Sequence, residues 1–502
     1  MIGELVDNLI GVFSPASAAR RVHARHVLNT SLRRGYEAAN TNRLNANWRT
    51  ANRSADAELF DSADAIRARA RDLVRNNAYA RGVQRALVRN VVGCGIKPQA
   101  RVTEDEPVNA AIETAWEQWQ RTADVTGRLS FYQIQSLAYA ETLEAGEVLI
   151  RYVEPTNRKR RIPFALELVE ADRLAADYFV RGINKVTGNE VRRGIEFNSS
   201  GEPVTYWLYS SHPNDINSWR VEAKPYPAEQ FTHLFRQERI GQTRGVSIYA
   251  PVLFWLKNLS YLVENELQAS AVASCFTAVI KSMGGGADGG ILDTIDSSAT
   301  DTDGNMFEYI QPGLVARLMP GEEVQVINPQ RSHSESQAWI DLMLRSIAVG
   351  TGISYERLSR DYSKTNYSSN RASDLEDRRE FRPIQDWLIS DLCVPVWERW
   401  MSVAVNAGID GFPSPFEFLG DFETWTRHIW QPPGWEWVDP VKEQQASADA
   451  IASNQSTLAE ELGKRGRDWR DVIDQRSREV QYIQQAGLTD TTQTTTEVVN
   501  AA

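Results

Sequence analysis

The chain has 502 residues and a net charge of −11, so it is long enough for about three domains, each with a core of its own. Its three cysteines lie far apart in no metal-ligand spacing and are expected to be free thiols of a reducing compartment: Cys94, Cys275 and Cys393. No signal-peptide pattern or apolar run of membrane length is found, so we expect a soluble protein made in a cytoplasm.

Positive charge is concentrated near the N-terminus. Between Arg20 and Arg101 there are 16 arginines and one lysine against six acidic residues, a local balance of +11, so the rest of the chain carries −22. Residues 1–62 are polar with few periodic apolar positions, which predicts a flexible basic arm. The acidic body is not expected to grip nucleic acid, because phosphate binding needs accumulated positive charge.

Arginines recur at four-residue spacing along two predicted helices that begin at Ala63 and after Asn76-Asn77. Like charges at this spacing repel by about a few tenths of a kcal/mol per pair. Either something acidic lies alongside, such as a neighbouring subunit, the acidic body or nucleic acid, or the arginines form a solvated face with local pairing. The residues concerned are Arg67, Arg71, Arg75, Arg81, Arg85 and Arg89.

Helices and strands alternate up to about residue 245. Helical patterns cover residues 108–122 and 132–144, and the segments GEVLIRYV, PFALELVE and PVTYWLYS have the alternating or fully apolar character of strands. His233, within FTHLF, is expected to be a satisfied strand residue rather than a catalytic base. Residues 63–245 are therefore predicted to form an α+β domain.

A long helix is predicted from Pro251 to Ser282, within residues 246–282, and would span about 48 Å. Glu264 and Glu266 in its middle argue against a lipid span, where buried charges are costly. The helix is apolar almost all round at its start and rich in small residues further on. It either stays within one domain as a core helix or leaves the domain to pack beside copies of itself.

Residues 283–334 are small and acidic and then strand-like, which predicts a compact inserted module. A second helix at 335–351 could return beside the first, so the module would sit at the tip of a two-helix stalk. Residues 352–373 are predicted to be a loop that contains Arg357, Arg360 and Lys364. Beyond it, residues 374–438 are expected to begin as a long helical segment that bends at Pro383 and Pro395 and to return to the first domain. The proline- and tryptophan-rich residues 410–440 are expected to pack there as irregular structure. Helices are expected at 439–485 and a disordered tail at 486–502.

Catalytic and ligand motifs are not found, so we expect no enzyme, no catalytic residue, no metal and no cofactor. The segment GGGADGG lacks the lysine and hydroxyl of a phosphate-binding loop, and no HExxH or GxSxG occurs. Aligning Asp301 and Asp303 with a calcium loop leaves Ala299 and Ile310 at positions that need carboxylates. The histidines show no ligand spacing apart from His23 and His26.

Four stretches resemble the signature blocks of lambda-family bacteriophage portal proteins, in the order of that family. They lie between residues 65 and 373, and weaker similarity extends to about residue 480. The stretches are RARARDLVRNNAYARGVQRALVRNVVGCGIKPQ, LELVEADRL, HLFRQERIGQTRGVSIYAPVL and LRSIAVGTGISYERLSRDYSKTNYSSNRAS.

The resemblance implies a homo-oligomeric ring, usually of twelve subunits, at one capsid vertex of a virion that is assembled in the host cytoplasm. Double-stranded DNA would pass through the ring during packaging and ejection. The terminase large subunit, a head-completion or adaptor protein, and the major capsid protein or scaffold would be partners, and no membrane is implied. The implied parts are a wing at 63–245, a two-helix stem, a clip at 283–334, a tunnel loop at 352–373 and a crown at 439–485.

The same resemblance suggests roles for charged residues. An acidic channel would let DNA slide, because a basic one would hold the phosphates, about one per 1.7 Å of duplex. Glu264 and Glu266 are expected to face the channel or to pair with a neighbouring stem. Arg357, Arg360 and Lys364 would make brief phosphate contacts, and the six spaced arginines would bridge adjacent wings.

Two other classes of function stay open from the residues. One is a metal-dependent nuclease or phosphohydrolase that uses the Asp-rich segment 293–303, including Asp301. The other is a DNA-binding protein that uses the arginine-rich helices, which would bind tightly and with strong salt dependence.

Overall fold

The chain divides into two units, Met1–Ser54 and Ala55–Ala502, and nearly all of the described structure belongs to the second. The computed structural model describes residues 20, 23, 43, 50–103, 106–155, 160–176, 181–216, 222–274, 278–282, 299–300, 306–307, 322–326, 333–363, 365–435 and 440–486. The expected end of the arm at residue 62 is wrong, because helix α3 (Ala55–Leu59) already belongs to the folded body. Its Asp56 accepts hydrogen bonds from the amide and hydroxyl of Thr243.

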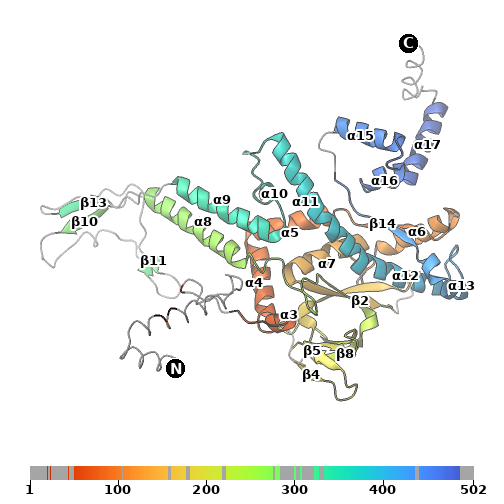
Figure 1. The fold of residues 1–502 in the computed structure, drawn as a ribbon, viewed down its shortest axis with the longest axis horizontal. Coiled ribbons are helices and arrows are strands. Elements are labelled where there is room, and N and C mark those ends of the chain that lie inside the picture. The colour runs from red at the N-terminus through yellow and green to blue at the C-terminus, as the bar shows by residue number, and fades with distance from the viewer. Residues whose placement is uncertain are drawn as a thin grey trace, which may run out of the picture. The chain divides into compact units, whose positions relative to one another are not determined.

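Four amphipathic helices form one part of the core: α4 (Ala63–Asn76), α5 (Ala78–Val91), α6 (Glu106–Gln120) and α7 (Phe131–Ala145) (Figure 1). Asn77 begins α5 by accepting a hydrogen bond from the Ala80 amide, and Ser130 begins α7 with a capping box. These ends confirm that the apolar periodicity of this region indicates helices.

A cluster of aromatic rings joins distant segments of the chain around Trp116 of α6. The ring centroid of Trp116 lies 5.1 Å from those of Trp397 and Trp400, both on α12 (Val394–Asn406), and 5.2 Å from that of Phe131. Trp430 completes the cluster from β14 (His428–Gln431), which pairs antiparallel with β1 (Lys97–Ala100). The large aromatic area buried here ties the C-terminal half of the chain to the N-terminal helices.

The segment from 410 to 440 is more regular than its proline and tryptophan content suggested. The short helices α13 (Pro415–Gly420) and α14 (Phe422–Trp425) precede β14. Ser414 begins α13 with a capping box that places the proline in the first turn, where it needs no hydrogen-bond partner. The expectation of irregular structure was wrong because capping and strand pairing, not propensity, order this stretch.

Two antiparallel sheets complete the α+β body. The first has the order β3-β2-β9, with β2 (Glu147–Val153) between β3 (Ala165–Glu170) and β9 (Phe231–Phe235). The second is a five-stranded meander of β4 (Arg181–Ile183), β5 (Glu190–Arg192), β6 (Ile195–Phe197), β7 (Pro203–Tyr209) and β8 (Ala223–Pro227). The three predicted strands are confirmed as β2, β3 and β7.

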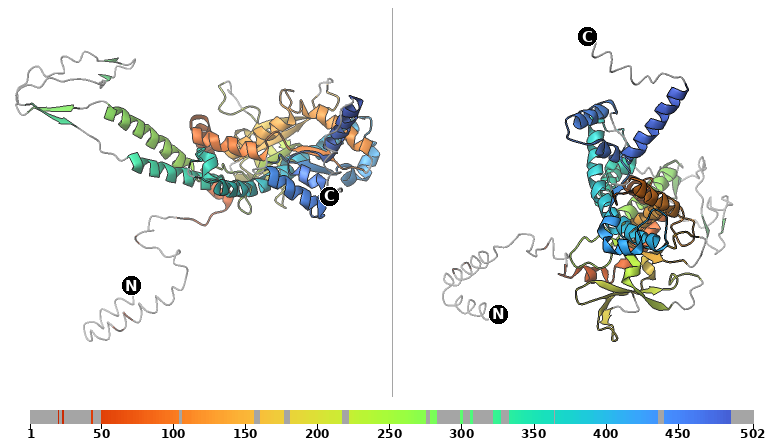
Figure 2. Two further views of the ribbon diagram at one scale, coloured as in Figure 1. Left: turned by 90° about the horizontal axis from the view of Figure 1, so that it is seen from above. Right: turned by 90° about the vertical axis from the view of Figure 1, so that its right-hand side faces the viewer.

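Two long helices leave this body as an antiparallel pair, α8 (Leu253–Ser274) and α9 (His333–Thr351). Figures 1 and 2 show them side by side from directions at right angles. The predicted extension of the first helix to Ser282 is wrong, because β10 (Ala278–Ser282) pairs with β13 (Glu322–Val326). The β-branched Val279 and Ile280 favour a strand once a partner strand is available.

Little of the segment between these strands is described. It contributes the short pair β11 (Ala299–Thr300) and β12 (Met306–Phe307). The glycine-rich segment and the aspartates proposed for metal binding lie outside the described residues. Among the helices that are described, none is long and apolar enough to cross a membrane.

The predicted loop at 352–373 is shorter than expected. It contains α10 (Tyr355–Ser359), and α11 (Tyr367–Leu388) begins at residue 367, where Asn366 forms a capping box with Ser369. Pro383 lies within α11, and Pro395 lies in the first turn of α12. The helical irregularity falls between the two prolines, as the π-helical segment Ile389–Cys393, rather than at either of them.

Three helices follow at the C-terminus, as predicted: α15 (Pro440–Ala452), α16 (Leu458–Gly463) and α17 (Trp469–Gln485). They contact the rest of the body through polar side chains. Asp468 accepts a hydrogen bond from Gln99 of β1, and Glu443 lies 3.6 Å from Arg371 of α11.

A buried charge cluster lies where the first sheet meets the segment that leads to α8. Glu147, at the start of β2, is fully buried, and both of its carboxylate oxygens lie 2.8 Å from Nε of Arg244. His233 Nε2 lies 3.0 Å away, the Gly245 amide donates at 3.0 Å, and Arg67 of α4 lies at 3.3 Å. One carboxylate therefore joins α4, two strands and the root of α8.

Close backbone packing sets this geometry. A methyl group on Gly245 would lie 2.0 Å from the carbonyl oxygen of Gly146, so the two segments can approach only because residue 245 is glycine. The approach places Arg244 directly against Glu147. Burial alone would raise the pKa of Glu147, but Arg244 and His233 outweigh it and hold the pKa well below the ordinary value of 4.5.

Replacing Glu147 with glutamine is expected to lower the free energy of unfolding by about 3–5 kcal/mol at neutral pH, since it leaves Arg244 buried without its counter-charge. The measurement is urea unfolding of the variant and the wild type. Glu167→Gln is a matched control, because Glu167 forms partly exposed ion pairs with Arg151 and Arg173 and should cost less than about 1 kcal/mol.

The pH dependence gives the same test a second readout. Folded Glu147 binds a proton more weakly than the unfolded chain, so its contribution is present above the ordinary glutamate pKa and is lost as pH falls below it. The difference between wild type and Glu147→Gln should therefore shrink between pH 7 and about pH 3. A difference that stays constant over this range would contradict the assignment.

Candidate conduit and subunit-contact elements

The helices α8 and α9 pack closely at the end nearer the α+β body and meet again further along. A methyl group on Gly350 of α9 would lie 2.4 Å from Cγ1 of Val252, so this glycine permits the close approach. Towards the other end, the Ser336 hydroxyl donates to Glu266 Oε1 at 2.9 Å. Contacts at both ends hold the two helices together as one stem.

The two glutamates predicted to face a channel differ in their surroundings. Glu266 is half-buried and faces α9, so it stabilises the helix pair and is not available as a bare channel charge. Glu264 is exposed, and none of the described side chains pairs with it. Residues 264 and 266 lie on different sides of the helix because two positions correspond to about 200° of rotation.

Sequence analysis missed a set of apolar side chains that the stem leaves uncovered. On α8, Phe254 is 68% exposed and Leu267 is 67% exposed, and on α9 Trp339 is 59% exposed. Others of the same kind are Tyr261, Leu342 and Val349. The signal was present in the sequence, since α8 is apolar almost all round at its start and one partner helix can cover only one side of it.

The root of the stem is also attached to the arginine-rich helix α5. Asn77 donates to the Ser260 hydroxyl at 2.8 Å, and the Tyr249 hydroxyl donates to the Ala80 carbonyl at 2.9 Å. These bonds are made by Asn77, which caps α5, and by Ala80 in the first turn of that helix. The direction of α5 and the direction of α8 are therefore fixed relative to each other.

The first two spaced arginines lie inside the chain's own charge network. Arg67 is 3% exposed and contacts Glu147 and Asp172, and Arg71 contacts Asp172 at 2.7 Å and Glu141 at 2.8 Å. Burial works against the charge of Arg71, but Asp172 and Glu141 outweigh it and raise its pKa. The prediction that Arg67 and Arg71 bridge to another subunit is therefore corrected, since their acidic partners are local.

The remaining four arginines are on the surface. Arg75 pairs with Asp72 on its own helix, 3.1 Å away. Arg81, Arg85 and Arg89 are exposed along one face of α5, and none of them has a side-chain partner among the described residues. Since α5 contains no acidic residue, this face presents three uncompensated positive charges at four-residue spacing.

Arg357, proposed as a DNA contact, is an anchor within the protein. Its guanidinium donates to Asp377 at 2.6 Å, to Asp374 at 2.9 Å and to Asn90 at 2.9 Å, which ties α10 to α11 and α5. The buried Asp377 also accepts hydrogen bonds from the amide and hydroxyl of Ser354. The base of the loop between α10 and α11 is thus rigid, and the prediction for Arg357 is corrected.

The tip of that loop differs from its base. Arg360 ends α10 in the left-handed conformation, with φ 58°, is exposed, and has no described partner. Tyr362 and Tyr367 are 53% and 58% exposed. Lys364 lies outside the described residues. Arg360 is therefore the predicted loop cation that the structure leaves accessible.

A search for reactive or metal-binding clusters finds one group among the described residues, Glu170, Asp172 and His212, whose ligand atoms lie within 4.8 Å of one another. Asp172 is already paired with Arg67 and Arg71, which together lower its pKa although burial alone would raise it. A carboxylate whose two oxygens each contact an arginine is a poor metal ligand. His233 is held by Glu147 within β9, as expected for a satisfied strand residue.

Comparison with known proteins gives relatives of nearly full length. The chain is 28% identical to a probable portal protein of Halomonas phage phiHAP-1 over 493 residues, which cover 94% of this chain and 90% of that protein. It is 26% identical to portal protein B of Escherichia phage lambda and to the portal protein of Escherichia phage N15, with 88% of each chain covered.

Among solved structures, the chain is similar to one in the neck of an empty GTA particle, with 13% identity and a TM-score of 0.47 over 78% of this chain and 92% of that one. The family model described as phage portal protein, lambda family, matches residues 41–385. Because this match covers more than half of the sequence, the chain belongs to the lambda family of phage portal proteins, and its role is that of a capsid portal.

Proposed function

We propose that copies of this chain form a ring whose stems, α8 and α9, surround a channel for double-stranded DNA during packaging and ejection. The observation that carries this proposal is the stem itself, a helix pair whose root is bonded to the body and whose apolar side chains are uncovered in the single chain. Exposed apolar surface of this extent marks a contact with another protein. In a ring, each stem would cover its neighbour's.

A ring of more than two copies needs two different surfaces on each copy, because its contacts are heterologous. The face of α5 that contains Arg81, Arg85 and Arg89 is proposed as one of these surfaces. Its three uncompensated charges would meet acidic groups of the next copy, as expected for a chain whose remaining sequence is strongly acidic. Arg75 is a secondary candidate, since it would have to exchange its local partner Asp72.

The channel contacts are proposed to be few. Glu264 would keep the stem surface acidic so that phosphates do not bind tightly, and Arg360 would contact the DNA backbone from the loop between α10 and α11. Lys364 is proposed for the same role on sequence grounds alone. Each phosphate that a cation neutralises steepens the slope of the log binding constant against the log salt concentration by about 0.9. A small number of cations therefore contributes little binding free energy, and each contact is brief.

The parts named by the family resemblance are proposed with adjusted limits. The wing would be residues 55–245, the stem α8 and α9, the clip residues 278–326, the tunnel loop residues 360–366, and the crown α15 to α17. The terminase large subunit, a head-completion protein, and the capsid protein or scaffold are proposed as partners, during assembly in the host cytoplasm. No catalytic role is proposed for any residue.

The ring is tested by native mass spectrometry of the purified protein, with negative-stain images of the same sample. We expect a closed assembly of about twelve copies with a central hole, since a heterologous contact closes when its rotation divides the circle. A stable monomer that binds DNA, or that cleaves it with a divalent metal, would contradict the proposal and favour one of the two alternative functions.

The face of α5 is tested by the triple variant Arg81→Glu, Arg85→Glu and Arg89→Glu. We expect loss of the ring with little change in the melting temperature of the monomer, because none of these side chains has a partner within the described chain. The matched control is Lys185→Glu with Lys224→Glu, two exposed cations on the second sheet. If the ring persists in the triple variant, this face is a solvated surface and not a subunit contact.

The loop is tested by comparing Arg357→Ala with Arg360→Ala. The first should lower stability by about 1–3 kcal/mol, because it leaves the buried Asp377 without its counter-charge. The second should leave the melting temperature unchanged and reduce the yield of packaged DNA, measured as nuclease-resistant DNA per particle. Equal effects of the two variants on stability would show that the division into anchor and contact residue is wrong.

A further inference from the structure

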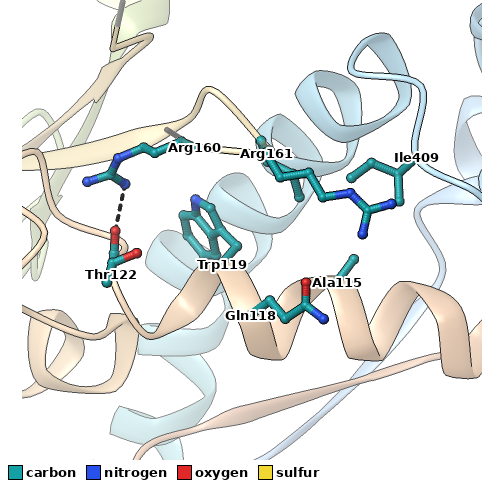
Figure 3. A pocket seen from close by; sticks show the side chains of 8 residues that line it. Ala115, Gln118, Trp119, Thr122, Arg160, Arg161 and Ile409 are labelled. Carbon is teal, nitrogen blue, oxygen red and sulfur yellow. Dashed lines mark hydrogen bonds between the residues drawn. The ribbon is translucent and has the colours of Figure 1, made fainter. Parts of the chain in front are cut away.

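A small cavity lies where the C-terminal end of α6 meets the segment that leads into β3. Its volume is about 180 Å³, and Figure 3 shows the side chains that surround it. Trp119 forms its floor, and Ala115, Ile162 and Ile409 form apolar walls. The indole N–H of Trp119 donates to the Phe164 carbonyl at 2.8 Å, so the ring is held in place.

Two adjacent arginines line the cavity in different ways. Arg160 donates to the carbonyl oxygens of Thr122 and Asp124, each at 2.6 Å, so it forms part of the wall. Arg161 is exposed and extends across the cavity towards Ile409, as Figure 3 shows, and its side chain has no partner within the described structure. The guanidinium of Arg161 therefore lies beside an apolar cavity without a counter-charge.

The turn after α6, next to Thr122 of the lining, contains further exposed arginines on a chain that is acidic as a whole. Arg121 and Arg128, which flank the turn after α6, are exposed, and the described residues provide neither with an ion pair. Two carboxylates of α6 and the turn after it are engaged. Asp124 accepts from the amide of Leu129 and the hydroxyl of Thr126, and Glu117 accepts from Gln120 and Tyr132. Arg161 therefore has no neutralising carboxylate among the described residues, and Arg121 is a further exposed cation next to Thr122 of the lining.

We propose that this cavity is a docking site for an acidic segment of a partner protein, which inserts one apolar side chain between Ala115, Ile162 and Ile409 and places a carboxylate against Arg161. Charge complementarity selects the acidic partner, and the apolar walls select the anchor residue. None of these residues belongs to the stem, to α5 or to the loop at 360–366, so the proposal adds a partner site to the DNA conduit.

A protein segment fits this surface better than nucleic acid does. Trp119 is only 6% exposed, so its ring offers no open face on which a base could stack. A cavity of this volume accepts a side chain the size of leucine but not a nucleotide with its sugar and phosphate. Arg161 at its rim suits a carboxylate next to such an anchor.

The test uses the full-length protein and a fluorescein-labelled peptide, EDELDE, with fluorescence anisotropy as the readout. The comparison peptide, EDESDE, replaces the apolar anchor with serine. We expect EDELDE to bind, and EDESDE to bind about tenfold more weakly, because serine cannot bury apolar area in the cavity. Competition by an unlabelled short duplex DNA is measured in parallel.

Two protein variants test separately how the charge of Arg161 and the cavity contribute to peptide binding. Arg161→Glu should weaken EDELDE about tenfold or more, and Gln118→Trp should do the same by covering the mouth of the cavity from an exposed position. Lys224→Glu, an exposed cation on β8, is the matched control and should bind as the wild type does. Melting temperatures within a few degrees of the wild type exclude misfolding as the cause of a loss.

Three results would overturn the proposal. The first is no binding of EDELDE by the wild type up to about 1 mM. The second is equal binding of the two peptides, or equal binding by wild type and Arg161→Glu, which would indicate non-specific charge attraction. The third is displacement of the peptide by duplex DNA with loss of DNA binding in Arg161→Glu, which would assign the surface to nucleic acid.

Discussion

The structure depends on the burial of one carboxylate. Glu147 cannot be solvated where it lies, so Arg244, His233, Arg67 and the Gly245 amide must all be in place around it. These groups come from the first arginine-rich helix, from the sheet and from the segment that leads to α8. Satisfying one buried charge therefore fixes the direction in which the stem leaves the α+β body.

The arginines of the chain fall into two groups that the tertiary structure separates. The arginines of the first group bind carboxylates or carbonyl oxygens within the chain and anchor the fold; they are Arg67, Arg71, Arg160 and Arg357. Arg81, Arg85, Arg89, Arg161 and Arg360 are exposed without described partners. An arginine within an internal network contributes to stability, whereas an exposed one without a counter-charge remains available to a second molecule. The proposals above rest on the second group.

The aromatic cluster around Trp116 and the stem differ in how completely one chain buries their apolar side chains. The aromatic cluster around Trp116 is complete within one chain, since rings from α6, α7, α12 and β14 bury one another. The stem is incomplete by comparison, because two helices cannot cover the apolar side chains that α8 presents all round. The body is therefore expected to be stable as a monomer, while the stem gains its full burial only in the assembly.

Local signals in the sequence determined much of this protein. Apolar periodicity and capping residues predicted the helices of the α+β body, the strands β2, β3 and β7, the paired stem helices and the C-terminal helices. Four long blocks of sequence identified the portal family. These features depend on neighbours within a few residues, so the sequence alone carries them. Such signals failed where a distant partner decided the outcome. The segment at 278–282 became a strand because β13 pairs with it, and β14 formed because β1 lies beside it.

The tertiary structure alone decided which charges are free. Spacing gave Arg67 and Arg81 the same expected role, yet one is buried against Glu147 and the other is exposed. The same is true of Glu266 and Glu264, and of Arg357 and Arg360. A charged residue type at a regular interval says where a side chain lies on its own helix. Whether that side chain is neutralised depends on partners in other elements, 20 residues away for Arg357 and Asp377 and 105 for Arg67 and Asp172, whose approach only the packed fold determines.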